Sequence, residues 1–250
     1  MEKPKIFLEA HNGLSALLVE RSKKYDGIWI SSLTHSASKG LPDNELVPLY
    51  ERVKLVEEIR KITTKPIMVD IDTGGSIAHL PYYIKWFEDA GAWAVVMEDK
   101  RFPKQNSLLE KGKHKLEEVD VFTEKIKTAK KRAKKLKIIA RLESLIAKHS
   151  LADALIRANA YVEAGADMIL IHSKQNVSAD EVMRFAKEFK KNVPLVAIPT
   201  TYKLPKKHPF SIIIKANQML RASLGAMKKV AEGKEVELAS VEDIFKLVGH

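Results

Sequence analysis

Polar side chains follow apolar runs at several points of this sequence, and their types suit a metal-dependent reaction on an anionic substrate. Glu98 comes directly after the apolar run at residues 94–97 and opens a polar segment, EDKRFPKQNS, at residues 98–107. Phe102-Pro103 stiffens its middle, because proline fixes its own φ and restricts the residue before it. Alone, such a segment is more often a solvated surface loop. Beside the other polar strand ends, it predicts a loop that covers an anionic ligand, with a metal at its root.

Two further carboxylates follow the apolar run at residues 66–69. In the sequence Asp70-Ile-Asp72-Thr-Gly-Gly, the alternation of an extended chain places Asp70 and Asp72 on one side. The chain has no cysteine and no histidine cluster, so carboxylates are the available metal ligands. Hard oxygen ligands suit Mg²⁺, which keeps several waters and takes one or two carboxylates. We therefore expect a divalent cation at Asp70, Asp72 and Glu98, the last through a metal-bound water.

A polar residue stands at or just past the end of most apolar runs, and each one has a simple structural explanation. Asp70 could cap the next helix, His172 could be a polar group at the mouth of a barrel, and Arg141 could only pair with Glu143. Several such groups converging on one mouth favour a functional site over these separate explanations. The expected ring is Glu9, Ser31, Asp70 with Asp72, Glu98, Arg141, His172 and Thr200.

The elements that must position these residues repeat one unit about eight times. Short apolar runs, typical of buried strands, alternate with segments of helical periodicity. We expect strands at residues 6–9, 27–30, 66–69, 92–97, 138–141, 168–171, 195–198 and 211–214. This order predicts an α/β fold of the (β/α)8 TIM-barrel type, whose active sites lie at the C-terminal ends of the strands. A doubly wound open sheet is the alternative. No linker of biased composition interrupts the chain, so we expect one domain over residues 1–250.

The expected helices carry several terminal signals. Ser150 with Asp153 forms a capping-box pattern, Gly165 ends that helix, and Ser178 with Glu181 and Ser240 cap two others. The expected helices are residues 13–24, 46–59, 78–90, 121–135, one from 150 to 165, one after 178, one from 216 and a last one after 240.

Composition limits the function further. The chain has 250 residues, 45% of them hydrophobic, and it shows neither a signal-peptide pattern nor a membrane-length apolar run. We expect a cytoplasmic protein without a membrane partner. The net charge of +11 suits an anionic substrate, a nucleic acid or an acidic membrane surface.

The most basic segment, KIKTAKKRAKKLK at residues 125–137, raises the possibility of nucleic-acid binding. Phe122, Ile126, Ala129 and Ala133 share one side of a helix here, and lysines are expected to cover the rest. No aromatic stacking platform accompanies the charge. A solvated helix face is therefore the favoured interpretation, and no nucleic-acid partner is expected.

Eight motifs in order resemble the phosphoenolpyruvate mutase branch of the isocitrate lyase/PEP mutase superfamily, and together they span nearly the whole chain. The most specific is EDKRFPKQNSL. The motifs are LEAHNGLSA at residues 8–16, GIWISSL at 27–33, VDIDTG at 69–74, EDKRFPKQNSL at 98–108, ARLESLIA at 140–147, ILIHSK at 169–174, IPTTY at 198–202 and KANQMLRA at 215–222.

The resemblance implies roles for particular residues. Asp70 would bind Mg²⁺ directly and also face the substrate, with Asp72 and Glu98 acting largely through metal-bound water. Lys104 and its neighbours would form a gating loop, and Asp43 would lie near the migrating phosphoryl group. The groups that surround the substrate would be the 29–33 segment on its carboxylate (Trp29, Ser31, Ser32, Leu33) and Asn106, Ser107, Arg141 and His172 around the phosphoryl.

The same resemblance implies an activity and an assembly. The activity is the Mg²⁺-dependent interconversion of phosphoenolpyruvate and 3-phosphonopyruvate, and phosphonopyruvate hydrolysis is the alternative. Asn106 favours the mutase, because the hydrolase branch does not keep this asparagine. The lack of cysteine argues against the carbon–carbon lyases, which use one in the corresponding lid.

The barrel would exchange its last helix with a neighbouring subunit, giving homodimers or homotetramers. Thr34-His35-Ser36 and Lys148-His149 depart from the family pattern, as does Gly74-Gly75, which lacks the aromatic residue often found between the two glycines.

Overall fold

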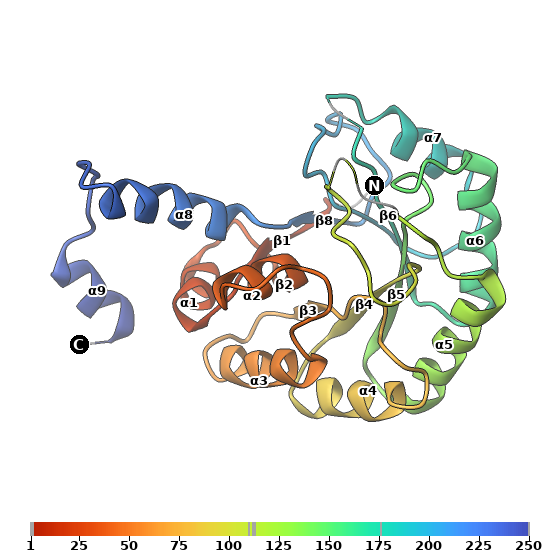
Figure 1. Cartoon of the computed structure of the whole chain (residues 1–250), viewed down its shortest axis with the longest axis horizontal. Helices are drawn as coiled ribbons and strands as arrows, with labels where there is room; N and C mark the ends of the chain where they lie inside the picture. Colours follow the sequence, from red (N-terminus) through yellow and green to blue (C-terminus); the bar gives the residue numbers. More distant parts are fainter. Residues whose placement is uncertain (1–2, 110, 112–113, 176, 250) are drawn as a thin grey trace.

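Eight parallel strands close into a barrel in chain order, as the sequence predicts (Figure 1). This computed structural model describes residues 3–109, 111, 114–175 and 177–249. The closed order excludes the doubly wound open sheet. The strands are β1 Lys5–Glu9, β2 Gly27–Ile30, β3 Ile67–Asp70, β4 Ala94–Glu98, β5 Lys137–Leu142, β6 Met168–Ile171, β7 Leu195–Ala197 and β8 Ile212–Lys215.

The register of the strands explains why polar groups meet at one mouth. Successive side chains on a strand point to opposite faces, so residues two apart share a face. Inside the barrel, Met68 is followed on the same face by Asp70, and Val96 by Glu98. Likewise Ile139 leads to Arg141 and Leu170 to His172. The buried stack that fills the barrel therefore ends in charged residues at its C-terminal rim.

Helices α3 to α7 surround the outside of the strands (Figure 1). A second apolar core lies between helices and strands, with Val53, Ile84 and Phe122 among its fully or almost fully buried members. The described helices are α1 Gly13–Arg21, α2 Ser32–Ser38, α3 Leu49–Arg60, α4 Leu80–Asp89, α5 Val119–Arg132, α6 Leu151–Glu163, α7 Asp180–Glu188, α8 Gln218–Ala231 and α9 Val241–Val248.

Some expected helix ends are confirmed and others are wrong. Ser150 and Ser240 accept the expected capping bonds, and Gly165 follows α6 with φ 103°. Ser178 does not cap α7, because the N-cap is Ala179 and the Ser178 hydroxyl accepts instead from the Asp180 amide. The helix expected over residues 121–135 ends at Arg132, since Ala133 is already extended.

The region after β2 differs most from the expectation. A short helix, α2, begins directly at the strand end, where a loop was expected. The next helix begins at Leu49 rather than near residue 46, because Pro48 holds an extended conformation at its N-cap. The segment between these helices, residues 39–48, runs over the mouth of the barrel and carries Asp43 and Glu45.

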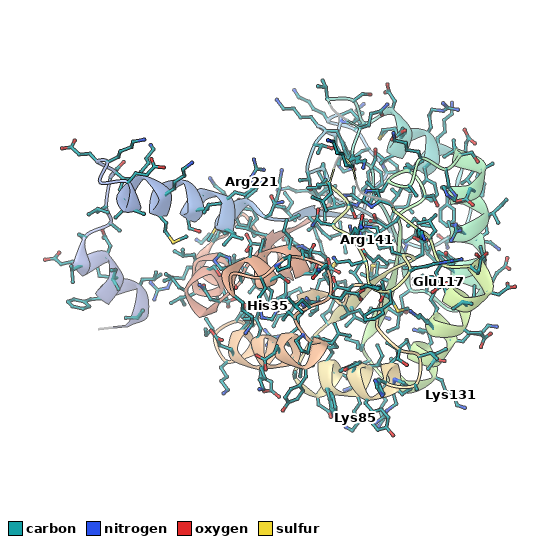
Figure 2. All side chains as sticks on the ribbon, in the orientation of Figure 1. His35, Lys85, Glu117, Lys131, Arg141 and Arg221 are labelled. Atoms are coloured by element: carbon teal, nitrogen blue, oxygen red, sulfur yellow. The ribbon has the colours of Figure 1, made fainter. Side chains whose placement is uncertain are left out.

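The last two helices extend from the ring of helices, and α9 meets it at α1, where Arg21 Nη1 donates to the Lys246 carbonyl at 3.1 Å. Figure 1 shows α8 leaving the barrel after β8 and α9 beyond it, and Figure 2 labels Arg221 on α8 well away from Arg141 in the barrel. Neither helix has a buried residue among those described. Apolar side chains stand exposed along both: Leu224, Met227, Val230, Val241, Ile244, Phe245 and Val248. No helix in the described part of the chain is long and apolar enough to span a bilayer.

Candidate active site

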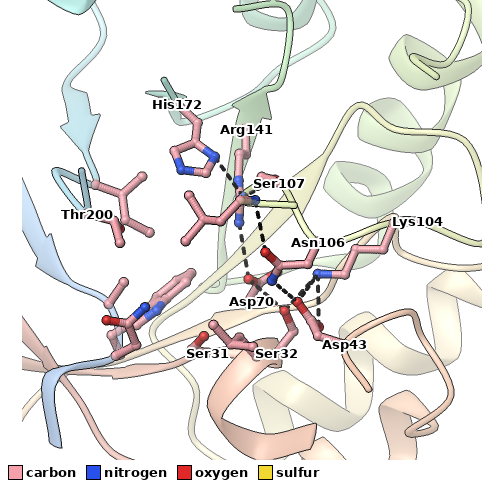
Figure 3. Close-up of a pocket in the computed structure, with 16 residues that line it drawn as sticks. Ser31, Ser32, Asp43, Asp70, Lys104, Asn106, Ser107, Arg141, His172 and Thr200 are labelled. Atoms are coloured by element: carbon pink, nitrogen blue, oxygen red, sulfur yellow. Dashed lines mark hydrogen bonds and ion pairs between the residues drawn. The ribbon is translucent and has the colours of Figure 1, made fainter. Parts of the chain in front are cut away.

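A cavity lies at the C-terminal mouth of the barrel, and most of the residues expected there line it (Figure 3). Asp72 and Glu98 are outside this lining and are reached through Lys104. Glu9 is also outside it, because its carboxylate contacts His11 Nδ1 at 2.6 Å and the Leu220 amide at 3.1 Å. The lining comprises Trp29, Ser31, Ser32, Leu33, Asp43, Asp70, Lys104, Asn106, Ser107, Leu108, Arg141, His172, Ile198, Thr200, Ala216 and Asn217.

Lys104 is buried beside carboxylates from two different loops. Its Nζ lies 2.7 Å from Asp72 Oδ1 and 3.2 Å from Asp43, and it donates to Ser32 Oγ at 2.9 Å. Burial alone would lower the pKa of this lysine, but the carboxylates around it raise the pKa well above its usual value. The segment of residues 101–109, here called the covering loop, is thus anchored by an ammonium group at the mouth of the barrel.

Asp72 is held between two cations. Arg52, on α3, donates from Nη1 to Asp72 Oδ2 at 2.7 Å and to the Asp70 carbonyl at 2.9 Å. Burial would raise the pKa of Asp72, but Arg52 and Lys104 together lower it below its usual value. Asp72 also has a φ of 54°, in the left-handed region that is unusual for residues other than glycine. The Arg52 pair fixes the chain in this turn.

Asp70 and Glu98 are the carboxylates best suited to a metal. Asp70 Oδ1 accepts the Asp72 amide at 3.0 Å, while Oδ2 has longer contacts to Ser32 and Arg141 at 3.2 and 3.3 Å. Neither oxygen of Glu98 has a hydrogen-bond donor among the described residues, although the side chain is fully buried. Burial raises the pKa of Glu98 to about 7.

This donor set fits a hard divalent cation such as Mg²⁺. A buried carboxylate without donors is costly unless a cation or water satisfies it. Within the described residues, no group of three acidic or histidine side chains is gathered closely enough to hold a metal alone. A cation here would therefore need water or ligand oxygens to complete its shell, as Mg²⁺ usually does.

Arg141 is the centre of a second network on the opposite side of the cavity. Its Nε donates to Glu143 Oε1 at 2.6 Å, and its Nη2 donates to Ser107 Oγ at 3.1 Å. Ser107 in turn donates to Glu143 Oε2 at 2.6 Å. Burial would raise the pKa of Glu143, but Arg141, Lys100 and His172 hold it well below its usual value. Glu143 thus fixes the guanidinium plane beside Asp70 and the covering loop.

The ring of His172 is buried beside the same two groups. Its Nδ1 lies 2.9 Å from Arg141 Nη2 and 2.8 Å from Glu143 Oε1. A guanidinium only donates and a carboxylate only accepts, so one ring nitrogen cannot form both bonds at once. Burial lowers the pKa of His172, which favours the neutral ring. The choice of partner for Nδ1 decides whether Nε2 carries the proton.

Asn106 links the covering loop to the segment after α2. Its Nδ2 donates to Asp43 Oδ2 at 2.6 Å, and its Oδ1 accepts the Leu108 amide at 2.9 Å. A side-chain amide carries two N–H groups, so one remains for a ligand in the cavity. Lys104 Nζ also donates to Asp43 Oδ2 at 3.2 Å and lies 3.2 Å from Oδ1, which accepts no hydrogen bond from the described residues.

Several residues of this site were missed from the sequence. Arg52 lies in the apolar stripe of α3 with Val53 and Val56, and an arginine in such a stripe is the signal that could have found it. Glu143 was considered only as a structural partner of Arg141, whereas it holds Ser107 and His172 as well. Glu45 carried no sequence signal, because the contacts that define it come from loops far away in the chain.

The basic segment at residues 125–137 is partly engaged within the fold. Lys125, expected on the solvated side, is buried, and its Nζ donates to the Thr73 carbonyl at 3.0 Å. Lys130 pairs with Asp167 at 2.7 Å. Phe122, Ile126 and Ala129 are buried as expected. The exposed charge of α5 is therefore smaller than its sequence indicates.

Comparison with known proteins finds relatives that match almost the full length of the chain. The family model described as phosphoenolpyruvate phosphomutase matches residues 1–234. A phosphonopyruvate hydrolase from Variovorax sp. (strain Pal2) is 37% identical, covering 97% of this chain and 89% of the relative.

Two solved structures resemble the fold closely. A phosphoenolpyruvate phosphomutase from Streptomyces platensis subsp. rosaceus has a TM-score of 0.91 at 34% identity, covering 100% of this chain and 92% of the other. A phosphonopyruvate hydrolase in complex with oxalate and Mg²⁺ has a TM-score of 0.87 at 34% identity, covering 99% and 90%. Equal identity to a mutase and a hydrolase does not separate these activities. The chain belongs to the phosphoenolpyruvate phosphomutase family, within the isocitrate lyase/PEP mutase superfamily of enzymes.

Proposed function

We propose that this protein is a phosphoenolpyruvate mutase that interconverts phosphoenolpyruvate and 3-phosphonopyruvate. The observation that carries the proposal is the bond from Asn106 to Asp43 over the cavity. Hydrolysis needs a water beside the phosphoryl group and a base to activate it. Asp43 lies in the segment between α2 and α3. Its Oδ2 accepts from both Asn106 and Lys104, and its Oδ1 lies 3.2 Å from the Lys104 ammonium group. A water would have to compete with these contacts before Asp43 could act as its base.

The remaining groups suit phosphoryl transfer within one bound substrate. Such transfers pass through a loose transition state, so the protein mainly positions groups and stabilises spread negative charge. Arg141 presents a planar, rigidly held guanidinium, and its always-charged fork matches phosphoryl oxygens. His172 and the second N–H of Asn106 add donors to the same space. Ser31, Ser32 and Leu33 would hold the substrate carboxylate beside Trp29.

We propose Mg²⁺ as the cofactor, with Asp70 as the direct ligand and with Asp72 and Glu98 acting through water. The oxygens of Glu98 accept no hydrogen bond from the described residues, although Arg141, Lys100 and Lys104 lie 3.5–3.9 Å from them, and this supports the assignment. The related hydrolase was solved with Mg²⁺ and oxalate. When bound, the ion supplies positive charge that stabilises an enolate oxygen and a carboxylate. The negative charge of Asp72 is already balanced by the ion pairs with Arg52 and Lys104.

Phosphonopyruvate hydrolysis is the second candidate. It is favoured by the hydrolase relative at 37% identity over 97% of the chain. Both activities begin from the same bound substrate and the same broken bond, and they differ only in what accepts the phosphoryl group. The contacts of Asp43 with Asn106 and Lys104 are the observation that supports the mutase proposal.

The assembly and its location are also proposals. We propose a homo-oligomer, a dimer or tetramer, in which α8 packs against a neighbouring subunit. The exposed apolar side chains of α8 and α9 support this arrangement. We place the enzyme in the cytoplasm, acting on a small molecule without a nucleic-acid or membrane partner.

Phosphorus NMR of the purified protein with Mg²⁺ and phosphonopyruvate tests the activity, because it separates phosphonate, phosphate ester and free phosphate. We expect phosphoenolpyruvate to appear, with inorganic phosphate as a minor product. Stoichiometric phosphate and pyruvate, with no phosphoenolpyruvate at any time, would establish the hydrolase instead.

A further inference from the structure

Glu45 joins two loops that are far apart in the sequence. Its Oε2 accepts the backbone amide of Lys104 at 2.7 Å. Its Oε1 accepts both the hydroxyl of Thr73, at 2.6 Å, and the Thr73 amide, at 3.1 Å. One carboxylate thus receives three hydrogen bonds from the covering loop and the loop after β3.

The backbone of Glu45 is held in an uncommon conformation. Its φ is 65°, in the left-handed region, which costs energy for a residue with a Cβ atom. Such a conformation persists where the surrounding contacts over-determine it. Here those contacts are the bonds to Lys104 and Thr73. We call the three hydrogen bonds of the Glu45 carboxylate the clamp, because they offset the energy cost of this backbone conformation.

The clamp acts on the residues that close the cavity. Asp43 is two residues before Glu45, and Thr73 directly follows Asp72. The side chain of Lys104 bonds to Asp43 and Asp72, while its backbone bonds to Glu45. The covering loop is therefore held at Lys104 in two ways, through its side chain and through its backbone amide.

A second cavity lies on the outer side of this clamp. It is lined by Glu45, Asp72 and Lys125 together with apolar residues that include Tyr83 and Phe102. Glu45 and Asp72 thus stand between the outer cavity and Lys104, which lines the catalytic cavity. Loss of the bond to the Lys104 amide would release the part of the covering loop that lies between the two cavities.

We propose that Glu45 is a positioning residue that holds the covering loop shut through the Lys104 amide, and that it thereby decides whether the phosphoryl group reaches the enolate oxygen or water. This inference rests on the proposed mutase function. Glu45 does not line the cavity, and it acts on the reaction only through Lys104 and Thr73.

The two outcomes share their first step. The bond between carbon 3 and phosphorus of phosphonopyruvate breaks, and its electron pair stays with the enolate of pyruvate. In the mutase outcome the phosphoryl group bonds to the enolate oxygen, giving phosphoenolpyruvate. In the other outcome it bonds to a water, giving phosphate, and the enolate takes a proton at carbon 3 to become pyruvate. Closure of the site excludes the water that the second outcome needs.

Three variants of Glu45 separate the clamp from the fold. Glu45→Ala removes all three bonds, and Glu45→Gln keeps a carbonyl oxygen that can accept only part of them. Glu45→Gly also removes the bonds, but it relieves the backbone at φ 65°, so it should fold at least as well as the alanine variant. Glu51→Gln is the matched control, since Glu51 is a carboxylate on α3 whose ion pairs, to Lys39 and Lys54, lie at the surface.

Limited trypsin digestion reports on the loop without any turnover. Cleavage after Arg101 or Lys104 is followed by mass, with and without Mg²⁺ and oxalate as the probe ligand. In the wild type and Glu51→Gln the ligand should slow this cleavage. In Glu45→Ala and Glu45→Gly, cleavage in the presence of the ligand should be about 10-fold faster than in the wild type, the effect of losing a hydrogen bond to a charged group. Equal protection in all four proteins would overturn the clamp.

The product ratio tests the second half of the inference. In phosphorus NMR, the ratio of phosphate to phosphoenolpyruvate should rise about 10-fold in Glu45→Ala and Glu45→Gly, and less in Glu45→Gln. If the Glu45 variants lose protection from trypsin but keep the wild-type ratio of phosphate to phosphoenolpyruvate, Glu45 does not decide which group accepts the phosphoryl. Wild-type protein that releases only phosphate would overturn both the mutase proposal and this role, while the protease result would still decide whether Glu45 holds the loop.

Discussion

The ammonium group of Lys104 lies 2.7 Å from Asp72 Oδ1, so a cation of the covering loop stands where the acidic strand ends converge. The same nitrogen is 3.9 Å from Glu98 Oε1. Closure of the loop therefore brings positive charge to the carboxylates next to the proposed metal position. The covering loop and the proposed metal site would thus be electrostatically coupled, and both would act on the anionic substrate proposed for this enzyme.

Asp70→Ala should remove the direct metal ligand without unfolding the barrel. Asp70 makes only modest side-chain contacts, to the Asp72 amide and to Ser32 and Arg141. We expect turnover to fall by roughly 10³-fold or more, the scale of losing a metal that stabilises several kcal/mol of developing charge. Turnover assays and thermal unfolding measure the two effects. Full activity of this variant, or of the wild type in excess EDTA, would contradict the metal assignment.

Asn106→Ala should slow phosphoryl transfer by roughly 10²-fold, the loss expected for one oriented charge-stabilising donor. It should also free one oxygen of Asp43, which Asn106 Nδ2 contacts at 2.6 Å. Asn44→Ala is the matched control, because Asn44 is an exposed amide in the same segment. Rates and products are measured by phosphorus NMR, and equal rates in the two variants would remove Asn106 from the mechanism.

Arg52 and Asp72 should be strongly coupled in stability. Their pair is almost fully buried, and removing one member leaves an uncompensated charge. We expect Arg52→Met to lower the free energy of unfolding by about 3–5 kcal/mol. Asp72→Asn should lower the free energy of unfolding less in the Arg52→Met protein than in the wild type. A double-mutant cycle by urea unfolding would detect this difference. Strict additivity would show that the pair does not stabilise the turn after β3.

His35 should make the protein less stable in mild acid. It is buried on α2, and burial followed by the charge of Arg52 lowers its pKa from 6.5 to about 4. Between these values the unfolded chain binds a proton that the folded protein does not, so stability falls as pH falls from 6.5 toward 4. Going from pH 7 to pH 5, this residue should account for a loss of about 2 kcal/mol.

The measurement for His35 is urea unfolding of the wild type and His35→Gln at both pH values. The variant should lose less stability on acidification than the wild type. Identical losses would mean that His35 takes up its proton in the folded state as readily as in the unfolded chain.

The exposed lysines of α5 and the turn after it should not matter for turnover. Replacing Lys130, Lys131, Lys134 and Lys135 with glutamine removes one ion pair, from Lys130 to Asp167, worth at most about 1 kcal/mol. We expect nearly unchanged kcat and KM, and the loss of any weak, salt-sensitive DNA retention. Binding of the wild type to one DNA sequence at physiological salt, with a clear preference over random DNA, would instead favour a nucleic-acid function.

The sequence predicted the barrel and the place of its site, because both depend on local patterns. Apolar runs identify strands, and the period of two places Asp70, Glu98, Arg141 and His172 on the inner face. The parts that were missed depend on contacts between distant segments. The role of Glu45 arises from bonds to Thr73 and Lys104, and no pattern near residue 45 encodes them. Ser178 shows the opposite error, since a capping pattern was present but Ala179 took the N-cap position.

The position of α8, outside the ring of helices, has a consequence for how the protein folds. The strands and the first seven helices can form from one chain, whereas Leu224, Met227 and Val230 on α8 are exposed and only Met219, at its start, packs against the core. If α8 packs against a neighbouring subunit as proposed, burial of these side chains needs an encounter between two folded barrels, which is a bimolecular event. Refolding should accordingly show a fast, concentration-independent phase for the barrel and a slower phase whose rate rises with protein concentration.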